Sequence, residues 1–427
     1  MKAGTLRKIV IGAAHEALPA ERDAERLARY LRPGTLSFAA MPPLSLYVHL
    51  PWCLKKCPYC DFNSHALTSR DGRDTGALPE ARYLDALRCD LEAALPFVWG
   101  RRVQSIFIGG GTPSLFEPES IDRLLGDIRA RLPLEPGAEI TLEANPGTFE
   151  RERFHAYRVA GVTRLSIGVQ SFNDSMLGRI GRVHDAAQAR AALAEAADAF
   201  ETYNIDLMYA LPGQTLAELA ADLDQALSFA PPHLSIYHLT LEANTVFGKY
   251  PPVLPDHDSA CDMLDHLVQV CSDRELQRYE VSAFARAGQR CVHNLNYWQF
   301  GDYLGIGAGA HSKLSYPHRV VRQVRQREPE SYMARALGGR SIASDEEVPR
   351  AQLPFEFMLG ALRLREGFEL ARFTERTGLP VSAVAPALGQ AQAQGWITQD
   401  LQRVQPTPTG FDFLNDLQSL FLAPDAD

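Results

Sequence analysis

Three of the seven cysteines stand close together, in the stretch CLKKCPYC. A structural zinc site uses four ligands, usually two close pairs, so zinc would need His49, His65 or a more distant residue here. An iron–sulfur cluster held by three thiolates instead leaves one iron open to an exchangeable ligand, whereas a cubane that only transfers electrons normally has four. The spacing of Cys53, Cys57 and Cys60 therefore favours a cluster that binds something.

Glycine and polar residues recur where successive apolar stretches end. The stretch GGGTP is not a phosphate-binding loop, because no GK[ST] follows it, and its simplest interpretation is a flexible turn. Three glycines do, however, let the backbone approach a ligand closely. A lone carboxylate is more often a cap or an ion-pair partner, but the whole set predicts a ligand site. Its members are Gly109, Gly110, Gly111, Thr112, Glu143, Gln170 and Asp206.

The elements that must position these residues alternate between strand and helix. From Leu44 the apolar run LSLYVHL is followed by a helical pattern, and five more pairs follow, with strands expected at VQSIFIGG, EITLEAN, LSIGVQS, NIDLMYALP and HLSIYHLTLE. Such alternation is typical of a parallel sheet. Six units predict an α/β protein with a partial (β/α)6 barrel, in which functional groups gather at the carboxyl ends of the strands.

The chain divides into four expected parts. Residues 1–43 form a variable N-terminal leader, residues 44–318 the barrel with a capping loop region rich in Gly, Asn and aromatics, and residues 319–353 a charged linker. Residues 354–427 alternate short helices with two short strands, which predicts a winged-helix-like α+β domain. From Arg350 onward there are six Arg, no Lys and nine Asp or Glu, so we expect this domain to pack on protein and not on nucleic acid.

Composition narrows the class of protein further. The 427 residues are 46% hydrophobic with a formal charge of -9, which indicates a globular protein and argues against an extended nucleic-acid surface. There is no run of 18 apolar residues and no apolar signal-peptide core, so we predict a cytoplasmic protein. Seven cysteines, an odd number with three clustered and four scattered along the chain, do not resemble a disulfide framework.

The motif C-x3-C-x2-C resembles the signature of the radical S-adenosylmethionine (radical SAM) enzymes. The resemblance implies that the three thiolates hold a [4Fe-4S] cluster, whose fourth iron takes the amino and carboxylate groups of S-adenosylmethionine. It further implies that GGGTP binds the methionine amino group, that Tyr59 packs beside the adenine and that Tyr47 approaches the sulfonium; on residue type alone both are ordinary aromatics. Further cosubstrate contacts are implied at Glu143, Gln170, Arg182 and Asp206.

Within this superfamily, residues 44–427 are most similar to the oxygen-independent coproporphyrinogen III dehydrogenase (oxidase) family. The similarity is carried by LYVHLPWC, GGGTPSLF, EANPGT, RLSIGVQSF and DLMYALPGQT. The true dehydrogenases extend the cysteine motif to C-x3-C-x2-C-x-C, and Phe62 stands at the position of that extra cysteine. The stretches CPYCDFNSH and HNLNYW instead resemble the haem chaperone branch of the family.

Three functional hypotheses are considered for this chain. The first is a haem chaperone that binds haem through His293 and passes it to an acceptor, with respiratory membrane proteins as the implied partners; a lone histidine in an aromatic loop is otherwise more often structural. The second is a dehydrogenase that decarboxylates coproporphyrinogen III, against which Phe62 argues. The third, a zinc-dependent or nucleic-acid-modifying protein, has no supporting feature. Residual S-adenosylmethionine cleavage is compatible with the first.

Overall fold

The computed structural model describes residues 23–67, 77–147 and 150–423. Its centre is a twelve-stranded sheet in the order β14-β13-β12-β11-β1-β4-β5-β6-β7-β8-β10-β9. The strands from β11 to β8 run parallel, and the remaining pairs are antiparallel. The parallel strands are β11 (Asp302–Ile306), β1 (Leu44–Leu50), β4 (Val103–Gly110), β5 (Leu134–Ala144), β6 (Arg164–Gln170), β7 (Thr202–Tyr209) and β8 (His233–His238). The outer strands are β9 (Gln277–Arg278), β10 (Ala283–Ala285), β12 (His311–Tyr316), β13 (Arg319–Arg325) and β14 (Ile342–Glu347).

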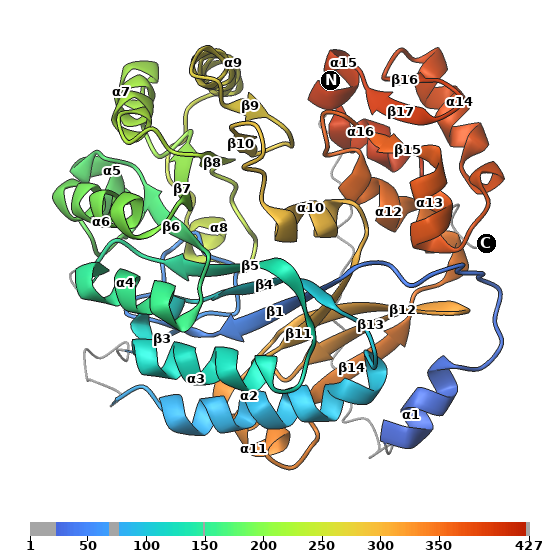
Figure 1. Ribbon diagram of the computed structural model, residues 1–427. Helices are drawn as coiled ribbons and strands as arrows, with labels where there is room; N and C mark the ends of the chain where they lie inside the picture. Colours follow the sequence, from blue (N-terminus) through green and yellow to red (C-terminus); the bar gives the residue numbers. More distant parts are fainter. Residues whose placement is uncertain (1–22, 68–76, 148–149, 424–427) are drawn as a thin grey trace.

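Six strand–helix units build the parallel part, so the predicted partial (β/α)6 barrel is confirmed. The helices cover the outer side of the curved sheet, and α10 (Val292–Trp298) lies on its inner side (Figure 1). The outer helices are α2 (Glu80–Ala94), α3 (Pro118–Arg129), α4 (Glu150–Ala160), α5 (Asp174–Arg179), α6 (Ala186–Ala199), α7 (Leu216–Leu227) and α9 (His257–Asp273), and the short α8 (Val246–Lys249) lies between β8 and α9 in sequence.

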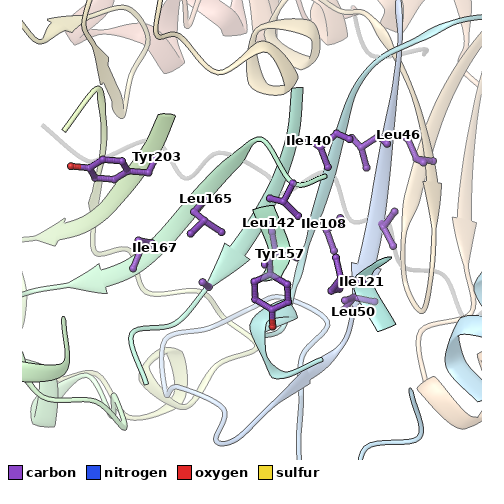
Figure 2. Packing of buried hydrophobic residues seen from close by; sticks show 14 of the residues in the cluster. Leu46, Leu50, Ile108, Ile121, Ile140, Leu142, Tyr157, Leu165, Ile167 and Tyr203 are labelled. Carbon is purple, nitrogen blue, oxygen red and sulfur yellow. The ribbon is translucent and has the colours of Figure 1, made fainter. Parts of the chain in front are cut away.

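The period of two along each strand separates a core face from a site face. In β1, Leu46, Val48 and Leu50 are fully buried in the main core, whereas the alternate residues carry hydroxyl, phenol and imidazole groups. Ile121 of α3 and Tyr157 of α4 belong to the same cluster as the strand residues, as Figure 2 shows. The polar residues therefore point into the barrel, and the apolar ones hold the helices.

Local sequence signals fix where several helices begin. Asp185 and Gln188 form a capping box at the start of α6, and Thr215 and Glu218 do the same for α7. Each box satisfies backbone N–H groups that the first helical turn leaves without partners.

Residues 319–353 are not the charged linker that their composition suggested. They form β13, α11 (Pro329–Ala336), β14 and the 3-10 turn η3 (Arg350–Gln352), and β13 and β14 extend the main sheet. The charges are mostly paired rather than solvated: Arg325 of β13 is buried against Asp90 at 3.1 Å, and Arg322 donates to Glu356. The expected capping loops likewise contain α10, β11 and β12, of which β11 pairs with β1.

Part of the expected leader is also tied to the sheet. α1 (Asp23–Tyr30) contributes Tyr30, which is buried against Tyr316 at a ring distance of 4.7 Å. The carboxylate of Asp345 on β14 accepts from Tyr30 and forms ion pairs with Arg26 and Arg29. The first 22 residues of the leader lie outside the described residues.

The C-terminal region has its own core and a three-stranded sheet, β15-β17-β16. This agrees with an α+β domain, although its first helix starts one residue earlier than the expected boundary. It contacts the barrel where Gly360 of α12 approaches Trp298 of α10. Across the described ranges, no helix has the length and apolar content needed to cross a bilayer. The elements of the C-terminal region are α12 (Leu353–Ala361), β15 (Phe368–Glu369), α13 (Leu370–Thr377), η4 (Val381–Ala383), α14 (Ala385–Ala393), β16 (Ile397–Gln399), β17 (Arg403–Pro406), α15 (Pro408–Asp412) and α16 (Leu414–Ser419).

Candidate functional site

The clustered cysteines lie on the segment that leaves the carboxyl end of β1. β2 (Trp52–Cys53) pairs in parallel with β3 (His65–Ala66), which folds the residues between them into a loop carrying Cys57 and Cys60. All three thiols are free and half-buried. The backbone N–H of Cys60 donates to the carbonyl of Cys57 at 3.2 Å, and its Sγ lies 3.6 Å from Ser64 Oγ. All three cysteines line the same cavity, Cys53 from β2 and the other two from the loop that follows it.

His49 is not available as a fourth ligand for zinc. Its Nδ1 hydrogen-bonds the Tyr47 hydroxyl at 3.0 Å and its Nε2 hydrogen-bonds the Asn63 carbonyl at 2.9 Å, so both ring nitrogens are engaged. Burial also lowers the pKa of His49 to about 4. In the described part of the chain, no three His, Cys, Asp or Glu residues are grouped to hold a single metal ion. Three thiols beside an open cavity fit an iron–sulfur cluster with one open iron better.

A cavity of about 400 Å³ opens beside the cysteines, and it collects most of the predicted site residues. Its lining includes the cysteine loop, the end of β4 and the inner faces of β5 to β8. This size is within the range of small-molecule and cofactor sites. The predicted residues in its wall are Cys53, Cys57, Tyr59, Cys60, Gly110, Gly111, Thr112, Glu143, Gln170, Arg182 and Asp206.

Two buried carboxyls in this wall have altered acidity. Burial, with a smaller contribution from the charge of Asp206, raises the pKa of Glu143 to about 7, although the Gly110 N–H donates to Glu143 Oε2 at 3.0 Å. Burial likewise raises the pKa of Asp206, against hydrogen bonds from Asn204 and Ser166. A cationic ligand would favour the ionised form of both carboxyls.

Arg182 connects the cavity wall to the cysteine loop. Its Nη2 donates to Asn145 Oδ1 and to the Gly168 carbonyl, both at 2.6 Å, and its Nη1 lies 3.7 Å from Cys57 Sγ. Gln170 has a φ of 69° at a register shift between β6 and β7. Such a bulge beside a site redirects a side chain that regular pairing would place elsewhere.

The glycines of GGGTP first serve to pack β4 against the cysteine segment. The amides of Gly111 and Thr112 donate to the carbonyls of Leu50 and Trp52, both at 2.8 Å. A Cβ on Gly111 would meet the Trp52 carbonyl oxygen at 2.4 Å, so only glycine fits there. These amides fix the cysteine loop, and the neighbouring Gly110 amide donates to Glu143.

His293 lies on α10, on the inner side of the barrel. Its Nδ1 hydrogen-bonds Ser105 Oγ at 3.1 Å and its ring lies 5.0 Å from that of Phe107. Burial lowers its pKa to about 3, so the imidazole is neutral near pH 7. His293, Tyr47 and Gly109 stand beside the cavity but do not line it; Tyr47 stacks on Phe107 instead.

Several residues of the cavity wall escaped the sequence analysis, namely Asn145, Arg164, Ser166, Asn204, His233 and Tyr237. Most lie at alternate positions of β6, β7 and β8, on the same face as the predicted residues. In RLSIGVQ and NIDLMY the polar residues stand at every second position, and this alternation is the sequence signal for the face that lines the cavity. Phe62, at the position of the missing fourth cysteine, also lines the cavity and is 64% exposed.

Comparison with known proteins agrees with this arrangement. The model of the radical SAM superfamily matches residues 47–226, and that of the HemN C-terminal domain matches residues 348–413. The fold resembles coproporphyrinogen III oxidase (HemN) from Escherichia coli with a TM-score of 0.76 and 24% identity, over 93% of both chains.

Curated relatives match at higher identity. Heme chaperone HemW from Escherichia coli (strain K12) is 47% identical over 385 residues, which cover 90% of this chain and 99% of the relative. Heme chaperone HemW from Haemophilus influenzae is 46% identical over 388 residues, covering 90% and 98%. This chain therefore belongs to the HemW family of the radical SAM superfamily.

Proposed function

We propose that this protein is a haem chaperone, which binds haem and transfers it to an acceptor protein. The observation that carries the proposal is the 46–47% identity to proteins named heme chaperone, across nearly their full length. Phe62 supports it, because the dehydrogenases of the wider family hold a further cysteine at that position. Coproporphyrinogen III dehydrogenase activity is the alternative. The similarity to HemN, at 24% sequence identity, shows a shared fold and does not itself favour this activity.

The cavity beside the cysteine loop is proposed to hold a [4Fe-4S] cluster and S-adenosylmethionine. Cys53, Cys57 and Cys60 would hold the cluster, and Glu143 and Asp206 would face the positive charges of S-adenosylmethionine. Together, the cluster and the cosubstrate would supply one-electron reductive cleavage of S-adenosylmethionine. Haem binding does not depend on this cleavage. Burial raises the pKa of Cys53 to about 11, so iron must bind before this thiolate is stable.

Removal of one cluster cysteine tests this assignment. We expect Cys57→Ser to lose cluster iron and sulfide after anaerobic reconstitution, because a cubane needs all three thiolates here. Cys261→Ser is the matched control, since Cys261 is an exposed thiol on α9. Full iron and sulfide content in Cys57→Ser would remove Cys57 from the ligand set.

Haem is proposed to bind beside α10 with His293 as the axial ligand. A neutral imidazole is the form that ligates iron, and the Ser105 contact at Nδ1 leaves Nε2 as the ligating atom. An outer partner of this kind orients a ligating ring. Tyr297, one helical turn further along α10, is 45% exposed and adds an aromatic surface on the same helix.

An anaerobic haem titration of the cluster-reconstituted protein, followed at the Soret band, tests this site. We expect saturable one-to-one binding, and we expect His293→Ala to weaken it by more than about tenfold, since even outer partners of a metal contribute roughly 10–100-fold. His155→Ala, which changes an exposed histidine of α4, is the control. Equal haem affinity in His293→Ala would exclude His293, and sustained conversion of coproporphyrinogen III would favour the dehydrogenase.

The acceptor is proposed to be a respiratory haem protein in the membrane, with the chaperone itself in the cytoplasm. The absence of a spanning helix in the described ranges is compatible with delivery by peripheral contact. Cosedimentation of the haem-loaded protein with membranes that contain haem-free respiratory proteins would test it. Equal cosedimentation with protein-free liposomes of the same lipids would argue against a protein acceptor.

A further inference from the structure

Arg164 is a buried cation in the cavity wall that the assignments above do not use. It begins β6, opposite Thr141 of β5 and Thr202 of β7. Its side chain belongs to the inner face of the barrel, and the whole residue is only 2% exposed. With His233, Cys291 and Asn294 it forms one end of the cavity, next to the start of α10; we refer to these four residues as the α10 end.

The guanidinium of Arg164 has little to compensate its burial. Its Nη1 donates to Thr202 Oγ1 at a long 3.4 Å, and its Nε has no hydrogen-bond partner. It takes part in no ion pair with any residue that the structure describes. A buried charge without a direct partner destabilises the folded state.

The nearby carboxylates are committed to other groups. Glu139 of β5 accepts from the backbone N–H groups of Val292 and His293 at 3.2 and 3.1 Å, and from the thiol of Cys291, so it caps the start of α10. Asp206 accepts from Ser166 and Asn204. The Arg164 charge does favour the ionised form of Asp206, but the two side chains form no direct ion pair, so a ligand carboxylate would supply the direct partner that the described residues do not.

The surroundings indicate which anion would fit. His233 is held between Asn204 Oδ1 at 2.6 Å and the Tyr279 hydroxyl at 2.9 Å, and burial together with the Arg164 charge keeps it neutral. The α10 end thus offers one cation and not two. A guanidinium matches a singly charged carboxylate with two parallel hydrogen bonds.

We propose that Arg164 binds a propionate carboxylate of haem at the α10 end of the cavity, an inference that rests on the proposed haem binding by this protein. His293 stands over β4 through its contact with Ser105, whereas Arg164 lies on β6. The two strands are separated by two strand spacings, about 10 Å. A single haem molecule would then place its iron at His293 and one propionate carboxylate at Arg164. This is possible because the propionates lie at the edge of the porphyrin, away from the iron.

The test compares haem with its dimethyl ester, which lacks both carboxylates. Anaerobic Soret titrations would use the cluster-reconstituted wild-type protein, Arg164→Met, Arg164→Lys and the control Arg158→Met, an exposed arginine of α4. We expect the wild type and Arg158→Met to bind haem about tenfold or more tighter than the ester, as a charge-assisted contact implies. Arg164→Met should bind both alike, and Arg164→Lys should recover part of the difference. Arg164→Met should also fold well, because it removes an unpaired buried charge.

Several results would overturn the inference. Equal wild-type affinity for haem and ester would do so, as would a preference for haem that persists in Arg164→Met. Weaker S-adenosylmethionine binding in Arg164→Met with unchanged haem preference would assign Arg164 to the methionine carboxylate instead. If the wild type bound neither porphyrin saturably, the haem proposal itself would fall, and this inference with it.

Discussion

At the scale of single residues, burial in the barrel determines the chemical state of the side chains. Glu143, Asp206 and His293 all have pKa values displaced toward the neutral form, because each of these side chains is buried. Arg164 is a buried cation in the same cavity wall. The site therefore contains carboxyls that a cation would ionise and a cation that an anion would neutralise.

The pKa of Glu143 gives S-adenosylmethionine binding a pH dependence. Above about pH 7 the carboxyl is already ionised and can accept the ligand amino group, whereas below it a proton must first be lost. We expect the affinity to fall as the pH is lowered from 7.5 to 5.5, by up to about tenfold per pH unit. Anaerobic calorimetry at each pH measures this.

Glu143→Gln separates this effect from other titrations. The variant should bind S-adenosylmethionine more weakly at pH 7.5 and with little dependence on pH. A pH dependence as steep as in the wild type would assign the titration to another group.

The sequence identified the cysteines but only part of the cavity wall, for a physical reason. Cys53, Cys57 and Cys60 are close in sequence, so their spacing alone reveals them. Arg164 and Asn204 meet only through the register between β6, β7 and β8, which no local pattern specifies. The capping role of Glu139 at α10 likewise joins residues more than 150 positions apart.

At the scale of elements, one buried aspartate joins the later strands to the barrel. Asp90 of α2 accepts from Arg325 at 3.1 Å, Ser341 at 2.7 Å and Tyr332 at 2.9 Å, and from the Gly307 amide at 3.2 Å. These partners come from β13, α11 and the segments around β11 and β14. The composition of residues 319–353 suggested a charged linker, because sequence alone does not show that Asp90 pairs with Arg325.

Removing this aspartate tests its role. We expect Asp90→Ala to lower the free energy of unfolding by about 3–5 kcal/mol, because Arg325 is left as a buried, unpaired charge. Urea denaturation of the cluster-free protein measures the change. Asp85→Ala, also on α2, loses two partly exposed ion pairs, with Arg123 and Arg88, and should cost about 1 kcal/mol or less. Equal losses in both variants would contradict the account.

At the scale of the whole molecule, the C-terminal domain supports the helix that carries His293. The guanidinium of Arg363 lies 4.2 Å from the centre of the Trp298 ring, and a Cβ on Gly360 would meet the Trp298 carbonyl oxygen at 2.7 Å. The domain was predicted from its helix and strand pattern, and its acidic charge indicated packing on protein. That it packs on α10 depends on contacts that composition does not encode.

This contact makes haem binding sensitive to α12. We expect Gly360→Val to weaken haem binding roughly five- to hundredfold, because overpacking costs about 1–3 kcal/mol and here displaces α10. Cluster content should remain unchanged. Gly389→Val is the control, since a Cβ on Gly389 of α14 meets only open space. Unchanged haem affinity in Gly360→Val would show that α12 does not hold α10 in its binding position.

Haem delivery by this protein can be measured by the recovery of respiration in haem-deficient membranes. Cluster-reconstituted, haem-loaded protein would be mixed with membranes from haem-deficient cells, and restored oxygen consumption would be recorded against equimolar free haem. We expect faster restoration by the wild-type protein than by free haem, and restoration at the free-haem rate by His293→Ala. Wild-type protein no faster than free haem would contradict the claim that this protein delivers haem.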